Sequence, residues 1–493
     1  MRAREIERHP LSLRELVLVF VEQSGVLYCI VVPQNGESSM TRPSLVVVCF
    51  VSVFTGCSSS DTGENPLTPN TDASQPTNAV TYYEHVKPIV DAYCVGCHAV
   101  GEIREQTPLD TYEGVHALKE LVKENVVERV MPPWLAAQDC ADYHGDQSLS
   151  EEQIATISTW VDEGGEAGQA SKEGAPLLLD PSDPIREDIT VQLSEPYSPK
   201  MVPDDYRCFL IPWPAEGKKY IVGFDAKPDN VQIVHHLIAY LVRPEDVETY
   251  KGYEAAEEGP GYTCFGAPVP PNAEAGAGST RWLGAWAPGG ENRRVPPGTG
   301  LPVEEGSYIS LQVHYNAQVA GESFDQSAVT FMVEDNVEQE AMILPWTNYM
   351  QWVAQKQMTI AAGDADASHS FAWDPTQFLG GPLTIYSASL HMHLRGKSAR
   401  TYLVRQDGSE ECMLDIPRWD FSWQRSYGFT EPRILNPGDK IGLECHWDNS
   451  PENQPWIDGE QAAPVDVNWG EGTGDEMCLG VYYITGMNNE LPL

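Results

Sequence analysis

The chain has 493 residues, of which 31 are Lys or Arg and 72 are Asp or Glu, giving a formal net charge of −41. Such acidity argues against nucleic acid and against anionic lipid surfaces as electrostatic partners, because both attract basic proteins. A surface solvated in salty surroundings explains it, and a basic redox partner or a cationic substrate is the alternative. The 38 Pro and 41 Gly predict loop-rich β structure rather than long helices, and the length predicts about three domains.

An export signal is predicted inside the chain rather than at its start. Met40 and a short basic region precede the apolar run SLVVVCFVSVFTG, which ends before Cys57. This order is typical of a bacterial lipoprotein signal peptide, in which the cysteine carries the lipid. Phe54 stands where Leu is usual, so an ordinary cleaved signal or a short membrane anchor is the alternative. We therefore expect residues 1–57 to be a leader whose true start is Met40.

Residues 58–80 are rich in Ser, Thr, Asn and Pro and offer little to bury, which predicts a disordered tether. A lipid on Cys57 would then place the later domains outside the cytoplasm, in the bacterial periplasm or at the cell surface, anchored to the outer membrane. Six cysteines beyond residue 100 fit export, because an even number favours disulfides. They are Cys140, Cys208, Cys264, Cys412, Cys445 and Cys478.

Residues 81–168 have the length of a small cytochrome c and contain the sequence C-V-G-C-H. In this motif two thiols one helical turn apart bond the vinyl groups of a haem, and the next histidine is an axial ligand. We therefore expect Cys94 and Cys97 to attach one haem c and His98 to bind its iron. The motif is short, and a chance occurrence or a zinc site is the alternative.

The sixth ligand of that haem is predicted to be Met131, in the sequence RVMPPW. It is the only methionine of this segment, and a thioether is the usual partner of histidine in haems that transfer electrons. His85, His116 and His144 are weaker alternatives. A haem with two axial ligands has no open position, so it would relay electrons rather than bind O2.

The segment closes with SLSEEQIATISTWVDEGG, which predicts a helix. Ser150 and Gln153 form a capping box, the apolar residues Ile154, Ile157 and Val161 share one face, and Gly164 ends the helix. In small cytochromes c a helix of this kind packs against the amino-terminal helix, which we place in YYEHVKPIVDAY.

From about Asp188 onward the chain changes to short strand-like runs separated by Pro and Gly, such as KYIVGFDAKP, SYISLQVHYNAQ and ARTYLVRQDG. This pattern is typical of antiparallel β-sandwiches. The expected fold is a small all-α cytochrome c domain followed by two all-β antiparallel, jelly-roll-like sandwiches. After a linker at residues 169–190, we place the sandwiches at residues 191–340 and 345–491.

Two groups of metal-ligand residues lie in this β region. The first comprises His235, His236 and His314, and the second comprises His391, His393 and Met477. Three imidazoles suit a copper that changes oxidation state, whereas two imidazoles with a thioether favour Cu(I), the state that reacts with O2. On a strand, His391 and His393 would project from the same face. Either group alone is a weak signal, because surface and core histidines are common.

Residues from about 200 to 484 resemble the copper type II ascorbate-dependent monooxygenases, the family of peptidylglycine α-hydroxylating monooxygenase and dopamine β-monooxygenase. The matching motifs are VHHLIAYLV, WLGAWAPGG with PPGTG before YISLQVHYN, LHMHLRGKSA, and DEMC before a hydrophobic strand. The resemblance implies that the first group binds an electron-storing copper. It implies that the second binds the copper at which O2 is activated, which makes His391, His393 and Met477 the catalytic residues.

The same resemblance implies the disulfides Cys208–Cys264 and Cys445–Cys478, and it leaves Cys140 and Cys412 unassigned. His369 and His446 are interpreted as a loop residue and a structural residue.

The sequence departs from the family where the peptide-hydroxylating member binds the carboxylate of its substrate. Ser389 stands in place of an Arg, and Leu479 and Val481 stand in place of an Asn and a Tyr. A peptidylglycine substrate is therefore not expected.

The sequence predicts a copper-dependent monooxygenase that hydroxylates a small organic substrate with O2, using two copper ions. An external donor would supply electrons through the fused haem. One alternative is a periplasmic haem–copper protein that transfers electrons or handles copper without hydroxylase activity. Another is a binding module that keeps the sandwich scaffold alone. The first alternative predicts no incorporation of ¹⁸O into an organic product, whereas a monooxygenase would incorporate it. The second alternative predicts a protein that binds no copper.

Overall fold

The computed structural model describes residues 16–23, 26–33, 79–102, 104–177, 185–202, 204–264, 267–271, 273, 281–286, 293–317, 323–457, 460–470, 472 and 474–487. The chain forms two compact units, Met1–Ser74 and Gln75–Leu493. In the first, β1 (Leu16–Gln23) and β2 (Val26–Pro33) pair as an antiparallel hairpin. The predicted signal peptide, Cys57 and nearly all of the tether lie outside the described residues. Within those residues, no helix is both long and apolar enough to cross a membrane.

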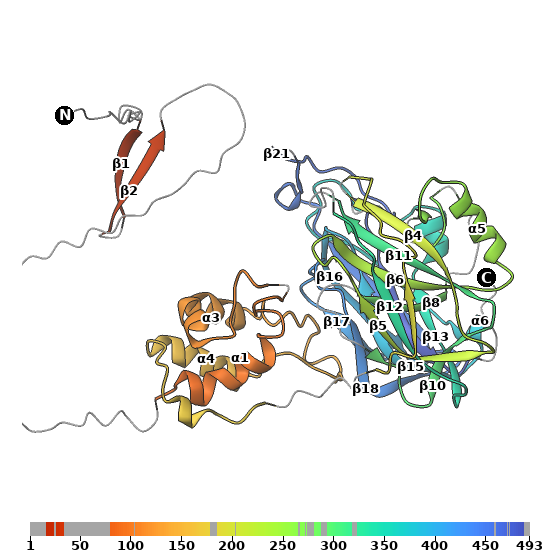
Figure 1. Ribbon diagram of the computed structural model, residues 1–493, viewed down its shortest axis with the longest axis horizontal. Coiled ribbons are helices and arrows are strands. Elements are labelled where there is room, and N and C mark those ends of the chain that lie inside the picture. The colour runs from red at the N-terminus through yellow and green to blue at the C-terminus, as the bar shows by residue number, and fades with distance from the viewer. Residues whose placement is uncertain are drawn as a thin grey trace, which may run out of the picture. The chain divides into compact units, whose positions relative to one another are not determined.

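The second unit begins with a helical region (Figure 1). Its last helix, α4, starts at the predicted capping box, and Gly164 beyond its end has a φ of 104°. Trp160 of α4 is fully buried and lies 5.9 Å from the ring of Tyr82, so α4 packs against the amino-terminal helical segment as predicted. The helices are η1 (Tyr82–Val86), α1 (Lys87–Tyr93), α2 (Tyr112–Ala117), α3 (Lys119–Val127), α4 (Glu151–Asp162) and the turn η2 (Ala170–Lys172).

The first β-sandwich follows. Its five-stranded sheet has the order β7-β4-β11-β6-β8 and packs on strands β10, β5, β12 and β3 of a larger sheet. Alternating apolar residues of both layers, among them Leu237, Leu311 and Phe331, form its core. Its elements are β3 (Ile189–Gln192), β4 (Asp204–Pro212), β5 (Lys219–Lys227), β6 (Val234–Val242), α5 (Val247–Ala255), β7 (Tyr262–Thr263), β8 (Arg281–Trp286), β9 (Arg293–Arg294), β10 (Thr299–Val303), β11 (Tyr308–Asn316) and β12 (Ala328–Glu334).

The second sandwich packs the sheet β14-β19-β16-β17 on strands β18, β15, β22 and β13. Its core includes Ile385, Leu443 and Ile484, all fully buried. Its elements are β13 (Gln339–Trp346), η3 (Tyr349–Ala354), β14 (Ala367–Trp373), α6 (Thr376–Leu379), β15 (Leu383–His391), β16 (Gly396–Val404), β17 (Glu410–Ile416), β18 (Ser426–Leu435), β19 (Lys440–Trp447), η4 (Pro451–Asn453), β20 (Trp456–Ile457), β21 (Glu460–Gln461) and β22 (Leu479–Thr485).

One continuous sheet joins the two sandwiches. Its order is β18-β15-β22-β13-β10-β5-β12-β3, with β9 added beside β5. The joint is a short parallel pairing of β10 with β13, in which Thr299 lies opposite Gln339. The hydroxyls of Thr299 and Tyr483 lie 2.9 Å apart across the same joint. This shared sheet was not predicted from the sequence, because two residues of pairing leave no readable pattern.

The segment between α3 and α4 (residues 128–150), called the docked segment below, lies against the second sandwich rather than within the helical core. Leu135, Ala136 and Tyr143 belong to the core of that sandwich. The Tyr143 backbone bridges Phe429 on the edge strand β18, and the Ala137 N–H donates to the carbonyl of Asp415 on the other edge strand, β17, at 2.8 Å. The segment therefore covers two strand edges that would otherwise be open for pairing.

Three disulfides link the described residues. Two are the pairs that the family resemblance implies, Cys208–Cys264 and Cys445–Cys478. The third pairs the two cysteines that were left unassigned, Cys140 and Cys412, across a sequence separation of 272 residues. Cys412 lies on β17, so this bond fixes the docked segment to the second sandwich. Multiple disulfides indicate a compartment outside the cytoplasm.

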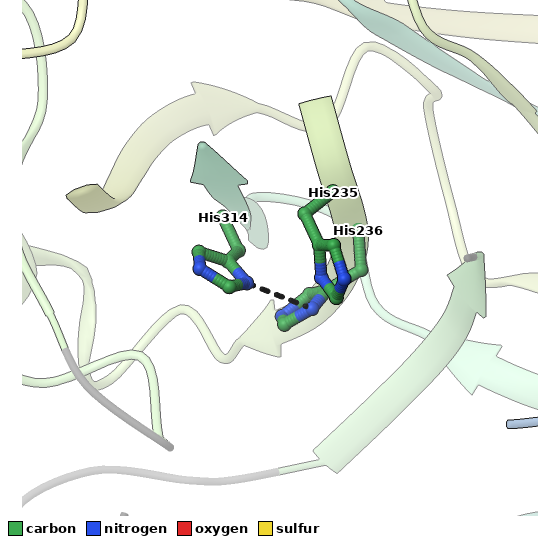
Figure 2. A group of neighbouring side chains, drawn as sticks. All are labelled: His235, His236 and His314. Carbon is green, nitrogen blue, oxygen red and sulfur yellow. Dashed lines mark hydrogen bonds between the residues drawn. The ribbon is translucent and has the colours of Figure 1, made fainter. Parts of the chain in front are cut away.

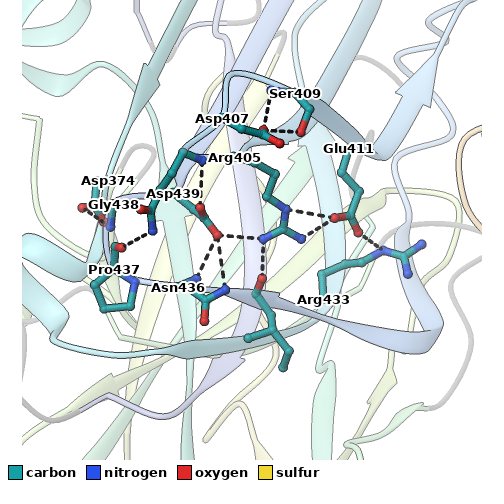
Figure 3. Close-up of polar contacts among 12 residues, drawn as sticks. Asp374, Arg405, Asp407, Ser409, Glu411, Arg433, Asn436, Pro437, Gly438 and Asp439 are labelled. Carbon is teal, nitrogen blue, oxygen red and sulfur yellow. Dashed lines mark hydrogen bonds and ion pairs between the residues drawn. The ribbon is translucent and has the colours of Figure 1, made fainter.

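A polar network at one end of the second sandwich ties its strands together (Figure 3). Arg405 pairs with Asp439 at 2.8 Å and also with Glu411, which in turn pairs with Arg433 at 3.3 Å. Arg405 also donates to the carbonyl of Ile434 at 2.7 Å. Because every charge here has a partner within the scaffold, the network serves the fold and offers no free group for chemistry.

Replacing Cys140 and Cys412 together with Ser should loosen the docked segment. We expect a loss of about 2–4 kcal/mol in the free energy of unfolding, since the bond closes a long loop. Amide hydrogen exchange should rise in residues 134–147 while the strands of the first sandwich stay protected. Equal exchange in the variant and the parent would contradict a clamping role for the bond.

Candidate metal centre

The first histidine group converges from two neighbouring strands, β6 and β11. His314 on β11 lies opposite His236, whereas the next residue, Tyr315, lies opposite Val234, so His235 is the extra residue of a β-bulge. Adjacent residues of a regular strand face opposite ways, and a bulge re-aims one of them. The imidazoles of His235 and His236 can therefore share a site with His314, as Figure 2 shows.

The three imidazoles are spaced to hold one ion. Within the described part of the chain, theirs is the one group of three His, Cys, Asp or Glu side chains whose ligand atoms all lie within 4.8 Å of one another. The Nδ1 atoms of His314 and His236 are 3.4 Å apart. The buried Nδ1 of His235 has no hydrogen-bond partner among the described residues. A buried nitrogen without a partner is costly, and a metal ion would satisfy it.

Burial favours the neutral form of His235 and His236, which is the form that binds metal. Desolvation, reinforced by His314, lowers the pKa of His235 to about 4. Desolvation also holds the pKa of His236 well below its usual value. The Nε2 of His314 lies 2.9 Å from a carboxylate oxygen of Asp204, which leaves its Nδ1 facing His236. The ring of Tyr206 stacks on His314 at 4.0 Å.

The second group lies at the end of β15. His391 is the last residue of that strand, and His393 lies beyond it. Both imidazoles face the same cavity, as predicted, whereas Met392 between them is buried in the core. Their rings are 5.0 Å apart and nearly perpendicular, and the chain turns only after His393. Met477, just before β22, lines the same cavity as both histidines.

Each histidine of this group has its Nδ1 committed to an oxygen. The Nδ1 of His391 bonds to the side-chain oxygen of Gln424, and the amide nitrogen of Gln424 donates to the carbonyl of Phe421 at 3.0 Å. The Nδ1 of His393 lies 3.0 Å from the carbonyl of Asp475. Both arrangements leave Nε2 for a metal. Desolvation lowers the pKa of His391 to about 3 and also lowers that of His393.

Glu476 holds the turn that carries His393. Its carboxylate is fully buried and accepts the backbone N–H groups of His393 at 2.9 Å and Arg395 at 2.6 Å, and the indole N–H of Trp447 at 2.9 Å. Because Met477 is the next residue, this one side chain positions both halves of the second group. Burial raises the pKa of Glu476 to about 7.

Both groups face one cavity of about 1940 Å³ between the sandwiches. Phe421 stands between them, with its ring 5.9 Å from His235 and 6.2 Å from His393. The cavity also receives Trp134 and His144 from the docked segment. His369 and His446 do not line it, and the expectation that His369 lies in a loop was wrong, because it lies on β14. The imidazole of His369 bonds to the carbonyl of Thr359, and that of His446 to Glu444.

The docked segment contacts Arg425, which directly follows Gln424, the residue that bonds to His391. Trp134 lies under the guanidinium of Arg425, which is 5.2 Å from its ring, and Arg425 also donates to Gln147 at 2.6 Å. Gln424, the hydrogen-bond partner of His391, is the residue immediately before Arg425. The helical region and the second histidine group are thus connected through two consecutive side chains.

The C-V-G-C-H motif closes α1 as a turn, in which the N–H groups of Cys97 and His98 both donate to the carbonyl of Cys94. Neither thiol is in a disulfide. The Nδ1 of His98 lies 2.9 Å from the carbonyl of Thr107, so its Nε2 is left to bind iron. These residues therefore fit a covalently attached haem. Met131 follows α3 and is half-buried, with its N–H donating to the carbonyl of Asn125 at 3.2 Å.

Several residues of these sites were not predicted from the sequence. Glu476 could have been suspected, because a carboxylate directly beside a ligand in DEMC is a candidate holder. The others contact the site only through tertiary structure and leave no local signal. They are Asp204, Phe421, Gln424, Trp134 and, in the role of a cavity residue, His144.

Comparisons with known proteins agree with this geometry. Residues 190–321 match the N-terminal domain of the copper type II ascorbate-dependent monooxygenases, and residues 350–491 match their C-terminal domain. DBH-like monooxygenase protein 1 of Gallus gallus is 22% identical over 57% of this chain and 45% of its own length. DBH-like monooxygenase protein 2 of Mus musculus is 23% identical over 54% of this chain and 42% of its own.

The chain thus spans less than half the length of these relatives. Among solved structures, the major capsid protein P2 of bacteriophage PM2 aligns over 58% of this chain with a TM-score of 0.22 and 8% identity, which supports no inference. The two domain matches together cover more than half of the chain. The chain belongs to the copper type II ascorbate-dependent monooxygenase family, a family of oxidoreductases.

Proposed function

We propose that this chain hydroxylates an organic substrate with O2 in the cavity between its sandwiches, with electrons delivered through a c-type haem in the helical region. The observation that carries the proposal is that two sets of metal-ligand side chains face one cavity, each from its own family-matched domain. When bound, the copper ions would supply one-electron redox chemistry and O2 activation.

The first group would hold one copper through His235, His236 and His314. The lowered pKa values of His235 and His236 favour the neutral form that binds metal, and Asp204 fixes the orientation of the His314 ring. An all-imidazole set tolerates both oxidation states of copper, which suits electron storage.

The second group would hold the other copper through His391, His393 and Met477. Its thioether favours the reduced ion, and Glu476 and Gln424 fix the two rings. We place the substrate beside this group, because Ser389, Leu479 and Val481 line the cavity next to His391.

Cys94, Cys97 and His98 would attach the haem, and Met131 would complete its ligands. The external donor is a redox protein or a small reductant that meets the helical region. A lipid on Cys57 would keep the protein at the bacterial outer membrane, in the periplasm or at the cell surface.

Replacing His391 or Met477 with Ala should lower bound copper from two ions to one per chain and abolish incorporation of ¹⁸O2 into products from a cell extract. His235→Ala should also lose one copper, but with loss of a different spectroscopic signal, since its site holds three imidazoles and no thioether. Metal analysis and electron paramagnetic resonance of each variant make the distinction. If the parent binds two coppers and reduces them through haem, yet labels no product, the chain is an electron-transfer or copper-handling protein instead.

Asp204→Ala should weaken copper binding at the first group by about 10–100-fold, because removing the partner of a ligating histidine frees its ring. The second group should keep its affinity. Asp335→Ala is the matched control, since Asp335 forms only an exposed ion pair with Lys219. Competition against a chromophoric Cu(I) chelator gives the affinities, and an unchanged first site in Asp204→Ala would contradict the role of Asp204.

Met131→Ala should leave the haem covalently attached but change its reduced spectrum and its potential, because the iron loses its thioether ligand. The double variant Cys94→Ala and Cys97→Ala should lose the haem and keep copper. Spectra and potentials are measured on purified full-length protein. A Met131→Ala spectrum identical to that of the parent would show that another residue is the sixth ligand.

A further inference from the structure

The described residues that line the cavity include no carboxylate. They are histidines, aromatic and aliphatic residues, small polar residues and two cations, Arg294 and Arg425. This is notable in a chain with 72 acidic residues and a net charge of −41. The outer surface attracts cations, whereas the described lining of the cavity has no anionic group to receive one.

The floor of the cavity around His391 is small and uncharged. On β15 the residues on the same face as His391 are Ser389 and Ser387, because side chains alternate along a strand. Ser389 lies opposite Val481 on one side and Ser426 on the other, and Ser387 lies opposite Tyr483 and Gly428. A substrate placed beside His391 would therefore meet hydroxyls and apolar groups.

The walls add aromatic surface and include two side chains from outside the family-matched domains, Trp134 and His144. Trp282 and Trp286 of β8 and Phe224 of β5 line the first-sandwich side, and Trp346 and Tyr483 line the second. His144 of the docked segment is held over the floor, because its N–H donates to the carbonyl of Gly428 at 2.8 Å. Trp134 lines the same cavity, and the guanidinium of Arg425 lies over its ring.

We propose that the substrate is an apolar, ring-containing molecule without a positive charge, and that the cavity selects against ammonium compounds. The inference rests on the proposed function, because only an enzyme would use the bound molecule as a substrate. The selectivity of binding is a property of the residues that line the cavity. Burying an ammonium without an anionic partner carries a large desolvation cost. Arg294, Arg425 and any bound copper ion would add repulsion to that cost, whereas a neutral aromatic molecule gains from contact with the walls.

Three probes that share a phenol ring and a two-carbon chain test the selectivity. They are 4-ethylphenol, which is neutral, tyramine, which carries an ammonium, and 3-(4-hydroxyphenyl)propionate, which carries a carboxylate. Calorimetric binding to the full-length protein should show tyramine at least ~10-fold weaker than 4-ethylphenol, a difference of about 1.4 kcal/mol. The titrations are run at two salt concentrations, since weak surface attraction of tyramine to the acidic chain is screened by salt.

Ser389→Asp should place a carboxylate on the floor and raise the affinity for tyramine relative to 4-ethylphenol. The matched control is Ser370→Asp, because Ser370 is exposed and does not line the cavity. Thermal melts establish that both variants are folded. Tyramine binding as tight as 4-ethylphenol in the parent, no binding of 4-ethylphenol, or equal behaviour of the two variants would overturn the inference.

The binding measurement needs no turnover, so its failure can be distinguished from failure of the proposed function. Selective binding without ¹⁸O incorporation would leave the cavity selectivity standing and defeat the hydroxylase. Hydroxylation of tyramine in preference to the neutral probe would support the hydroxylase and defeat the selectivity.

Discussion

The pairing of β10 with β13 fixes the two sandwiches as parts of one sheet. Each sandwich could bury its own core without the other, but neither alone forms the cavity. The first histidine group lies on β6 and β11 and the second lies at the end of β15, and both face the same space. Backbone hydrogen bonds across the joint, with the contact between Thr299 and Tyr483, therefore help to hold the two groups at one cavity.

Orientation of the imidazoles follows a common device. His98, His391 and His393 each commit Nδ1 to an oxygen and keep Nε2 for a metal, whereas His314 commits Nε2 to Asp204 and keeps Nδ1. In each case the partner comes from a loop or strand end that the core holds in place. The chemistry of the site thus depends on polar contacts one step removed from the metal ligands, and these contacts in turn depend on packing.

The helical region contributes to the second sandwich and to the cavity. Its segment between α3 and α4 covers the edges of β17 and β18, is bonded to β17 through Cys140–Cys412, and places Trp134 and His144 in the cavity. A substitution in this segment should therefore alter the position of His391, because the segment contacts Arg425 and the adjacent Gln424 bonds to His391.

Much of this could be read from the sequence, because some features repeat over short distances. The capping box of α4, the strand-like runs of β5, β11 and β16, and the ligand motifs are local patterns. The bulge at His235 and the pairing of Cys140 with Cys412 are not. They arise where distant segments meet, and sequence spacing carries no signal for them. The same is true of Gln424 and Asp204, which are ordinary polar residues until the fold brings them to a histidine.

We propose that two distinct metal sites share one cavity. Anomalous X-ray scattering at the copper edge, from crystals grown with copper, tests it most directly. The account predicts two peaks in each chain, one among His235, His236 and His314 and one beside His391, His393 and Met477, both bordering the same cavity. A single peak, or copper bound to residues outside these two groups, would contradict it.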